Sequence, residues 1–205
     1  MTAAISTYDE LLDKAADFML VAEADLNIPA FIRLAEAQFE PILRVREMEK
    51  TVNYIVGSES LTVPTSFLEA RSLTLPDSGR KLTYVSMDEF RARKSSTATP
   101  YIFTIWGEEL LVHPKPNADG TVKMVLDYMS RVSPLSTEAP VNPILKKYPD
   151  IYLYGLLTNS AGYLKDPEMQ STWGNLFSSA IQSANKANKR IVGQRLRMSP
   201  SGAPV

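Results

Sequence analysis

The chain contains one histidine, His113, and no cysteine, so the usual nucleophiles and transition-metal ligands are scarce. His113 lies at the end of a predicted strand, with no nucleophile-elbow sequence around it. Two carboxylate pairs, Glu47 with Glu49 and Glu108 with Glu109, have the residue types for acid–base catalysis. Their positions instead predict a solvated strand face and a polar turn. We therefore expect no catalytic residue, no metal site and no cofactor.

Basic residues form two small clusters. Arg44, Arg46 and Lys50 alternate along a predicted strand, and a second cluster lies within residues 91–94. Neither cluster accompanies a nucleic-acid reader motif, and the net charge of −1 does not favour tight phosphate binding. The sequence therefore gives little support for recognition of a nucleic-acid sequence.

Two amphipathic helices are predicted at the start of the chain. Apolar residues recur at steps of three and four over residues 7–23, where Thr7 has the residue type of an N-terminal cap. A second helix begins near Pro29 and should end or kink at Glu40, because Pro41 disfavours the helical conformation there.

The pattern then changes to the two-residue period of β-strands. Gly107-Glu108 separates two such runs and predicts a hairpin with a type II′ turn. A short helix is predicted at 87–93. The predicted strands are 44–56, 61–63, 81–86, 101–106, 109–113 and 122–130.

The last third returns to helices. Asn142-Pro143 is a typical helix start, and the helix predicted over 149–165 carries apolar residues on nearly every face, which indicates deep burial. The last helix is expected over 167–192 with Gly193 as its stop. Residues 194–205 contain few apolar groups and are predicted to be a flexible tail.

These elements predict an α+β fold, a helical bundle of about four long helices with an inserted small antiparallel β domain. We expect residues 1–43 and 140–193 to form the bundle and residues 44–139 to form the β domain. The 205 residues are 44% apolar, enough for a packed core. No apolar run approaches the roughly 18 residues of a membrane span, and no signal peptide is recognisable, so we expect a soluble chain made in a cytoplasm.

Charge is unevenly distributed along the chain. Residues 1–25 contain six acidic side chains and one lysine, whereas no acidic residue follows Glu168. The two ends of the chain could therefore form complementary contacts, within one subunit or between neighbours, or could simply be solvated helix faces.

Several stretches resemble the adaptor proteins of the head-to-tail connectors of short-tailed phages. The most specific is YPDIYLYGLLTNSAGYLKDPEMQSTW at 148–173. The others are IPAFIRLAEAQFEPILRVREME at 28–49, VPTSFLEARSLTL at 63–75 and LTYVSMDEF at 82–90. The resemblance runs from about residue 7 to about residue 192.

This resemblance implies a structural virion protein at the head–tail interface, assembled in the host cytoplasm. It implies a homo-oligomeric ring, usually twelve-fold, docked beneath the portal protein and presenting a surface to a tail nozzle or tail tube protein. Genomic DNA would pass through the ring without sequence specificity. The resemblance brings no catalytic residue with it.

We assign two sets of contact residues by hypothesis. The portal-binding set is at the C-terminus, where such adaptors often dock. It comprises Arg195, Leu196, Arg197, Met198, Ser199 and Pro200. The subunit-interface set joins the acidic first helix to the basic last one and comprises Asp9, Asp13, Asp17, Lys186, Lys189 and Arg190.

Three alternatives stay open at the level of sequence. The chain could form another ring of the connector, such as a stopper or nozzle. The β domain could instead be a module that binds carbohydrate or a receptor through exposed aromatic residues at 101–112. A polysaccharide hydrolase would need two carboxyl groups facing one cleft a few ångströms apart.

Overall fold

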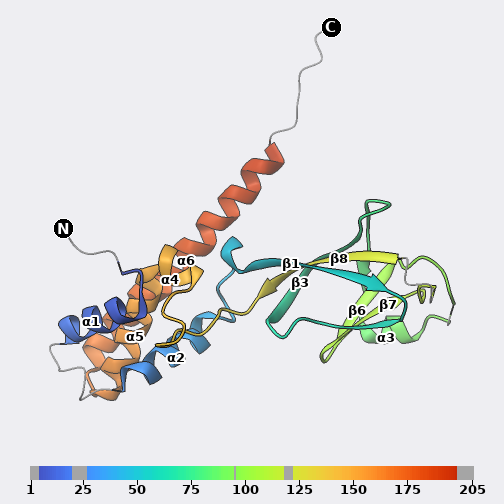
Figure 1. Cartoon of the computed structure of the whole chain (residues 1–205). Coiled ribbons are helices and arrows are strands. Elements are labelled where there is room, and N and C mark those ends of the chain that lie inside the picture. Colours follow the sequence, from blue (N-terminus) through green and yellow to red (C-terminus); the bar gives the residue numbers. More distant parts are fainter. Residues whose placement is uncertain (1–4, 20–26, 95, 118–121, 198–205) are drawn as a thin grey trace, which may run out of the picture. The chain divides into compact units, whose positions relative to one another are not determined.

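The structure is a computed structural model, and it describes residues 5–19, 27–94, 96–117 and 122–197. The chain divides into two compact units (Figure 1). The helical unit comprises residues 1–47 and 132–205, and the β unit comprises residues 48–131. The β unit thus begins four residues later and ends eight residues earlier than the expected 44–139. The α+β class is confirmed.

The helical unit is built around one buried helix. It contains α1 (Tyr8–Met19), α2 (Ile28–Phe39), α4 (Pro143–Lys147), α5 (Pro149–Tyr163) and α6 (Pro167–Arg197). The helix α5 packs against the other four, which explains why its sequence is apolar on nearly every face. Tyr152 and Leu156 of α5 are fully buried, with Ala15 of α1 and Ala35 of α2.

Side chains cap several of these helices, and the caps of α1 and α4 are those that the sequence predicts. Thr7 Oγ1 accepts from the Glu10 N–H at 3.3 Å, and Glu10 Oε2 accepts from the Thr7 N–H at 3.1 Å, which forms a capping box. Asn142 Oδ1 accepts from the Leu145 N–H, and Asp166 caps α6 in the same way. Each cap satisfies a backbone donor that the helix itself leaves unpaired.

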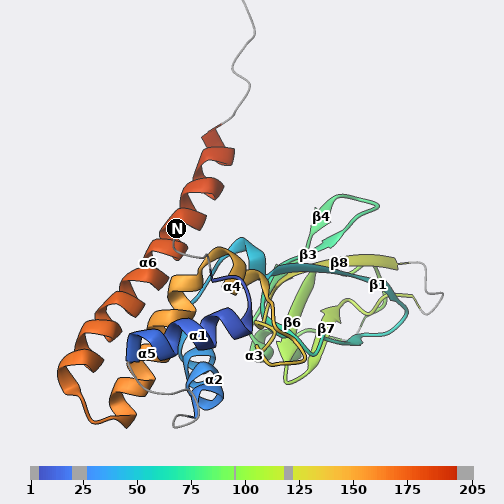
Figure 2. The same ribbon diagram turned by 60° about the vertical axis from the view of Figure 1, so that its left-hand side comes forward.

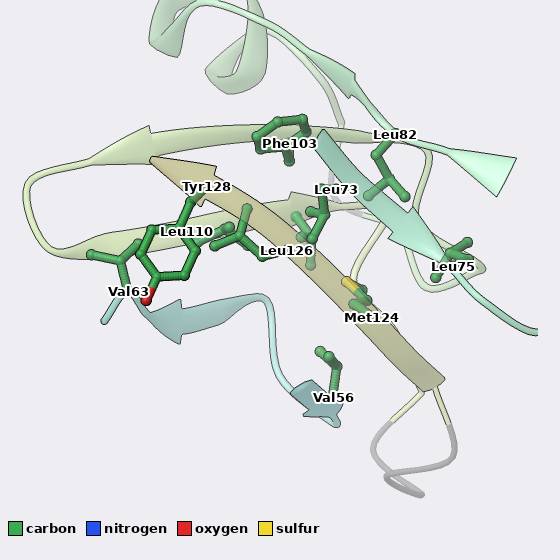
Figure 3. Close-up of a cluster of buried hydrophobic side chains, with 11 residues drawn as sticks. Val56, Val63, Leu73, Leu75, Leu82, Phe103, Leu110, Met124, Leu126 and Tyr128 are labelled. Carbon is green, nitrogen blue, oxygen red and sulfur yellow. The ribbon is translucent and has the colours of Figure 1, made fainter. Parts of the chain in front are cut away.

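The β unit consists of two four-stranded sheets packed face to face. One has the order β1 (Glu49–Val56), β8 (Val122–Ser130), β3 (Phe67–Leu75) and β4 (Arg80–Lys81). The other has the order β2 (Ser60–Thr62), β7 (Glu109–His113), β6 (Ile102–Trp106) and β5 (Thr83–Tyr84), with α3 (Met87–Arg91) following β5. Both sheets contribute to one apolar cluster (Figure 3).

The predicted alternation of β8 and the predicted hairpin are confirmed. Met124, Leu126 and Tyr128 lie on the buried face of β8. The strands β6 and β7 pair antiparallel, with Gly107 at φ +60° in the turn between them. Because Glu108 does not share this positive φ, the turn is type II′ and not type I′.

Two sequence predictions about these elements are wrong, and one strand was missed. Strand β3 was not predicted, although it pairs with β8 at the centre of its sheet. The first strand starts at Glu49 and not at 44, because Arg46–Met48 form a 3₁₀ turn. The run predicted at 81–86 is split at Leu82, where the chain passes from one sheet to the other, and β5 pairs parallel with β6.

The end of the last helix is also corrected. The helix α6 runs through Gly193 to Arg197, so residues 194–197 are helical and not part of a tail (Figure 2). Glycine inside a helix costs only about 1 kcal/mol relative to alanine, and the following residues are good helix formers. Gly193 therefore lowers helix propensity without ending the helix.

Candidate assembly interface

An acidic row lies along the first helix. Asp9, Asp13 and Asp17 follow one another at four-residue steps on α1, and all three are exposed. Lys14 forms an exposed ion pair with Asp17 at 2.9 Å. Such an exposed pair contributes little to stability, and the row keeps its negative character. The acidic row is thus available to a partner.

Two exposed lysines, Lys186 and Lys189, form the basic counterpart on α6. Among the described residues, no ion pair joins either lysine to the acidic row. The hypothesis of a contact within one subunit therefore finds no support here. A contact between neighbouring subunits would have to compete with one ion pair among the described residues, that of Lys14 with Asp17. The side chain of Arg190 lies outside the described residues.

The predicted portal-binding residues divide into two groups. Arg195, Leu196 and Arg197 lie in the last turn of α6, and their side chains are outside the described part. Met198, Ser199 and Pro200 lie outside the described residues altogether. Within the helical unit, the last turns of α6 extend beyond the other helices (Figure 1).

Two asparagines on α6 hold this long helix against the segment that follows α2. Asn185 Oδ1 accepts from the Arg44 N–H at 2.7 Å, and Asn185 Nδ2 donates to the Ile42 carbonyl at 2.9 Å. Asn188, which is buried, donates to the Arg44 carbonyl at 3.1 Å. These contacts were not predicted, because asparagine on a polar helix face normally indicates solvent. They hold the helix in place immediately beside Lys186 and Lys189.

Apolar side chains also reach the surface near the acidic row. The Phe18 ring, 49% exposed, meets the Trp173 ring edge-on at 5.8 Å. Met169 and Leu176 lie on the same side of α6 as Trp173 and are 50% and 40% exposed. Leu176 lies at the exposed margin of α6, next to the buried Phe177. Exposed apolar residues next to a charged row are typical of a protein–protein interface.

The residues considered as candidates for catalysis, His113 and Glu47, contact other side chains of the fold. His113 is buried, with its ring edge-on to Phe90 and Tyr101. Glu47 was predicted to share a strand face with Glu49. It lies instead in the 3₁₀ turn, where it pairs with Lys147. Within the described residues, no group of three potential metal ligands is present.

A partly buried cluster of ionisable side chains holds in place the chain segment that follows the β unit. Glu36 of α2 accepts from the Leu135 N–H at 2.9 Å and from the Tyr152 hydroxyl at 3.0 Å. Asn142 donates to the same hydroxyl at 2.6 Å, and Glu40 accepts from the Val132 N–H at 3.1 Å. Burial raises the pKa of Glu36, and the hydrogen bonds from Leu135 and Tyr152 only partly oppose this shift.

The substitution Glu36→Gln should therefore change stability in a pH-dependent way. The free energy of unfolding of the variant, relative to that of the unchanged protein, should increase as the pH rises. A carboxyl group with a raised native pKa stabilises the fold below its unfolded pKa, near 4.5, and this contribution is lost as pH rises through the native pKa. Glutamine keeps the accepting oxygen and cannot ionise. Urea unfolding of both proteins from pH 4 to pH 8 measures the difference, and a difference that is constant across that range would contradict this assignment.

The exposed charged row, the lysine pair and the apolar margin are together typical of a protein that assembles with other proteins. Residues 6–201 match the SU10 adaptor protein family, and the chain belongs to that family. It is therefore a phage adaptor, a structural component of the virion that interacts with portal and tail components. No curated protein matches the chain. In the described part of the structure, no helix has both the length and the apolarity that crossing a membrane requires.

Proposed function

We propose that this protein forms a ring beneath the portal at the head–tail interface, extends the DNA channel and joins the capsid to a tail nozzle or tail tube protein. The observation that carries this proposal is the family match, which covers both units of the chain. The ring holds twelve copies and assembles in the host cytoplasm. The subunit acts without catalysis or a cofactor.

The helical unit supplies the contacts between neighbouring subunits. A ring uses one heterologous interface, in which two different surfaces of the same subunit meet and the rotation closes. The acidic row on α1 and the lysine pair on α6 are two such surfaces, of opposite charge and exposed. In this arrangement Asp9, Asp13 and Asp17 of one copy face Lys186, Lys189 and Arg190 of the next.

DNA passes through the channel without sequence recognition. Each close phosphate contact adds to a salt-dependent grip, so a lining with few such contacts leaves DNA free to move. The net charge of −1 is compatible with this role. Arg44, Arg46 and Lys50 were predicted to alternate along one strand. They do not form such a basic face, because Arg44 precedes the strand and its guanidinium donates to the carbonyls of Glu40 and Leu43.

Reversing the charges of the acidic row tests the subunit interface. The variant with Asp9, Asp13 and Asp17 all changed to lysine should reduce ring formation on purified portal at least about tenfold, because like charges would then face each other. Changing Lys186 and Lys189 to glutamate should have the same effect. A protein carrying both sets should assemble again, since its charges are exchanged and still complementary. Mass photometry of the portal complex measures assembly.

The matched control changes three exposed acids of the β unit, Asp88, Glu108 and Glu109, to lysine. This variant carries the same change in net charge, and we expect it to form rings normally. Failure of the doubly reversed protein to assemble, with its helical content intact, would show that these residues do not face each other between subunits.

A further inference from the structure

The helix α6 presents two different surfaces on opposite flanks of its buried stripe. This stripe consists of Phe177, Ile181, Ala184 and Asn188. Because successive residues of a helix turn by about 100°, Trp173 lies on one flank of the stripe and Asn185 on the other. Trp173 contacts Phe18 of α1, whereas Asn185 is hydrogen-bonded to the segment that follows α2. The two flanks therefore face different neighbours within the helical unit.

The flank on the α1 side is aromatic and has an acidic border. We call it the aromatic surface, and it comprises Phe18, Met169, Trp173 and Leu176. The Trp173 ring also stacks on the Tyr154 ring of α5 at 5.9 Å, so three helices hold this surface in place. The acidic row ends at Asp17, the residue before Phe18. An apolar centre with a charged rim is the usual composition of a protein–protein interface.

The flank on the other side is aliphatic and has a basic border. Ile42 is 54% exposed, and its carbonyl accepts from Asn185 Nδ2 at 2.9 Å, which fixes its backbone beside α6. Lys186 directly follows Asn185 in the chain, and Lys189 lies one helical turn beyond it, on the same flank. We call Ile42 with these two lysines the Ile42 surface. It matches the aromatic surface in apolar character and opposes it in charge.

We propose that the aromatic surface of one subunit binds the Ile42 surface of a second copy of this chain, and that this contact forms the apolar centre of the ring interface. Ile42 of one copy packs against Phe18, Met169 and Leu176 of the next, and the acidic row meets the lysine pair around them. This inference rests on the proposed function, which supplies the ring and its charge pairing.

Charge decides which surface of the second copy is the occupant. Two aromatic surfaces in contact would bring two acidic rows together, and two Ile42 surfaces would bring two lysine pairs together, which like-charge repulsion opposes. Only the pairing of one surface with the other is complementary. Each such contact leaves one free surface at either end, so copies add until the rotation closes a ring.

Cross-linking between introduced cysteines tests the contact directly, because the sequence contains no cysteine of its own. The variants Met169→Cys and Ile42→Cys are purified separately, mixed, and treated with a short bis-maleimide, with and without purified portal. We expect at least about tenfold more covalent two-subunit product with portal than without, because neighbours in a ring are held at a high effective concentration. Either variant alone should give no such product.

Leu34→Cys is the matched control for Ile42→Cys. Leu34 is 50% exposed, belongs to α2 of the same unit and lies outside both surfaces. Mixed with Met169→Cys, it should give only background product. Equal yields with Leu34→Cys and Ile42→Cys would overturn the inference.

The remaining outcomes of the cross-linking experiment are distinguishable. Products between two Met169→Cys copies, or between either variant and the portal, would assign the aromatic surface or the Ile42 surface to another occupant. A ring seen by mass photometry without the expected product would contradict this inference and leave the proposed function intact. The absence of any complex with the portal would contradict both.

Two polar substitutions provide a second test. Phe18→Ser and Ile42→Ser should each weaken ring formation on purified portal at least about tenfold, because each removes an apolar side chain from the centre of the interface. Ile42 is exposed and only its backbone is bonded to Asn185, so its variant tests the contact even if Phe18→Ser does not fold. Leu34→Ser is the control. Unchanged assembly by Ile42→Ser, or an equal loss caused by Leu34→Ser, would overturn the inference.

Discussion

Removal of residues 194–205 is expected to abolish attachment of the adaptor to the portal while leaving both units folded. The deleted segment contains Arg195 and Arg197, at the basic end of a chain that has no acidic residue after Glu168. A short segment at a chain end can contribute contacts to a large partner without altering the fold of the rest of the chain. We expect the Kd for purified portal to rise at least about 100-fold, which is about 2.7 kcal/mol.

A second truncation refines this test, because α6 continues to Arg197. Deleting only residues 198–205 keeps the last helical turn and separates its contribution from that of the residues after it. The melting temperature and the helical circular dichroism signal of both truncated proteins should match those of the full chain within a small margin. Normal portal attachment by the protein that lacks residues 194–205 would refute the assignment of this segment.

Replacing Gly155 by leucine is expected to destabilise the helical unit by more than about 3 kcal/mol. A Cβ atom at Gly155 would lie 2.8 Å from the Ala35 Cβ of α2 and 2.9 Å from the Phe177 ring of α6. Ala35 has no flexible side chain that could move away, so α2 itself would have to shift. Urea unfolding followed by circular dichroism measures the loss.

A pair of alanine substitutions controls for helix propensity. In a helix interior alanine is favoured over glycine by up to about 1 kcal/mol, so Gly174→Ala should stabilise the protein. The nearest atom to a Cβ there is Thr158 Cγ2 at 3.7 Å, an ordinary contact. Gly155→Ala should be destabilising, because the close approach outweighs the gain in propensity. Stabilisation by both substitutions would show that α2 and α6 do not pack tightly on α5.

The helices were predictable because their apolar spacing and caps are local. The buried face of α5 and the caps Thr7 and Asn142 followed from residue types within a few positions. The hairpin turn was predictable for the same reason, since glycine at the first central position is required by the backbone itself.

The strand β3 was missed because the burial of its residues depends on contacts with residues far away in the sequence. Its burial changes along its length, with Phe67 half-buried and Leu73 fully buried, so it lacks the clean alternation of β8. Bulges between Phe67 and Glu69 and between Ala70 and Ser72 interrupt its period.

The candidate assembly interface was partly predictable. The four-residue spacing of Asp9, Asp13 and Asp17 was enough to place them on one face of a helix, and they are exposed. The hydrogen bonds of Glu36 with Tyr152 could not be foreseen, because they join residues from separate helices and a returning segment. The contacts of the acidic row and the lysine pair within a ring, and those of the C-terminal segment with the portal, remain predictions.

The most direct test of the account is a mass measurement of the purified protein with and without purified portal. With portal, we predict a complex whose mass exceeds that of the portal by about 270 kDa, which corresponds to twelve chains of 22.8 kDa in a closed ring. If the protein and the portal keep their separate masses when mixed at micromolar concentration, the proposed role as the ring beneath the portal is wrong.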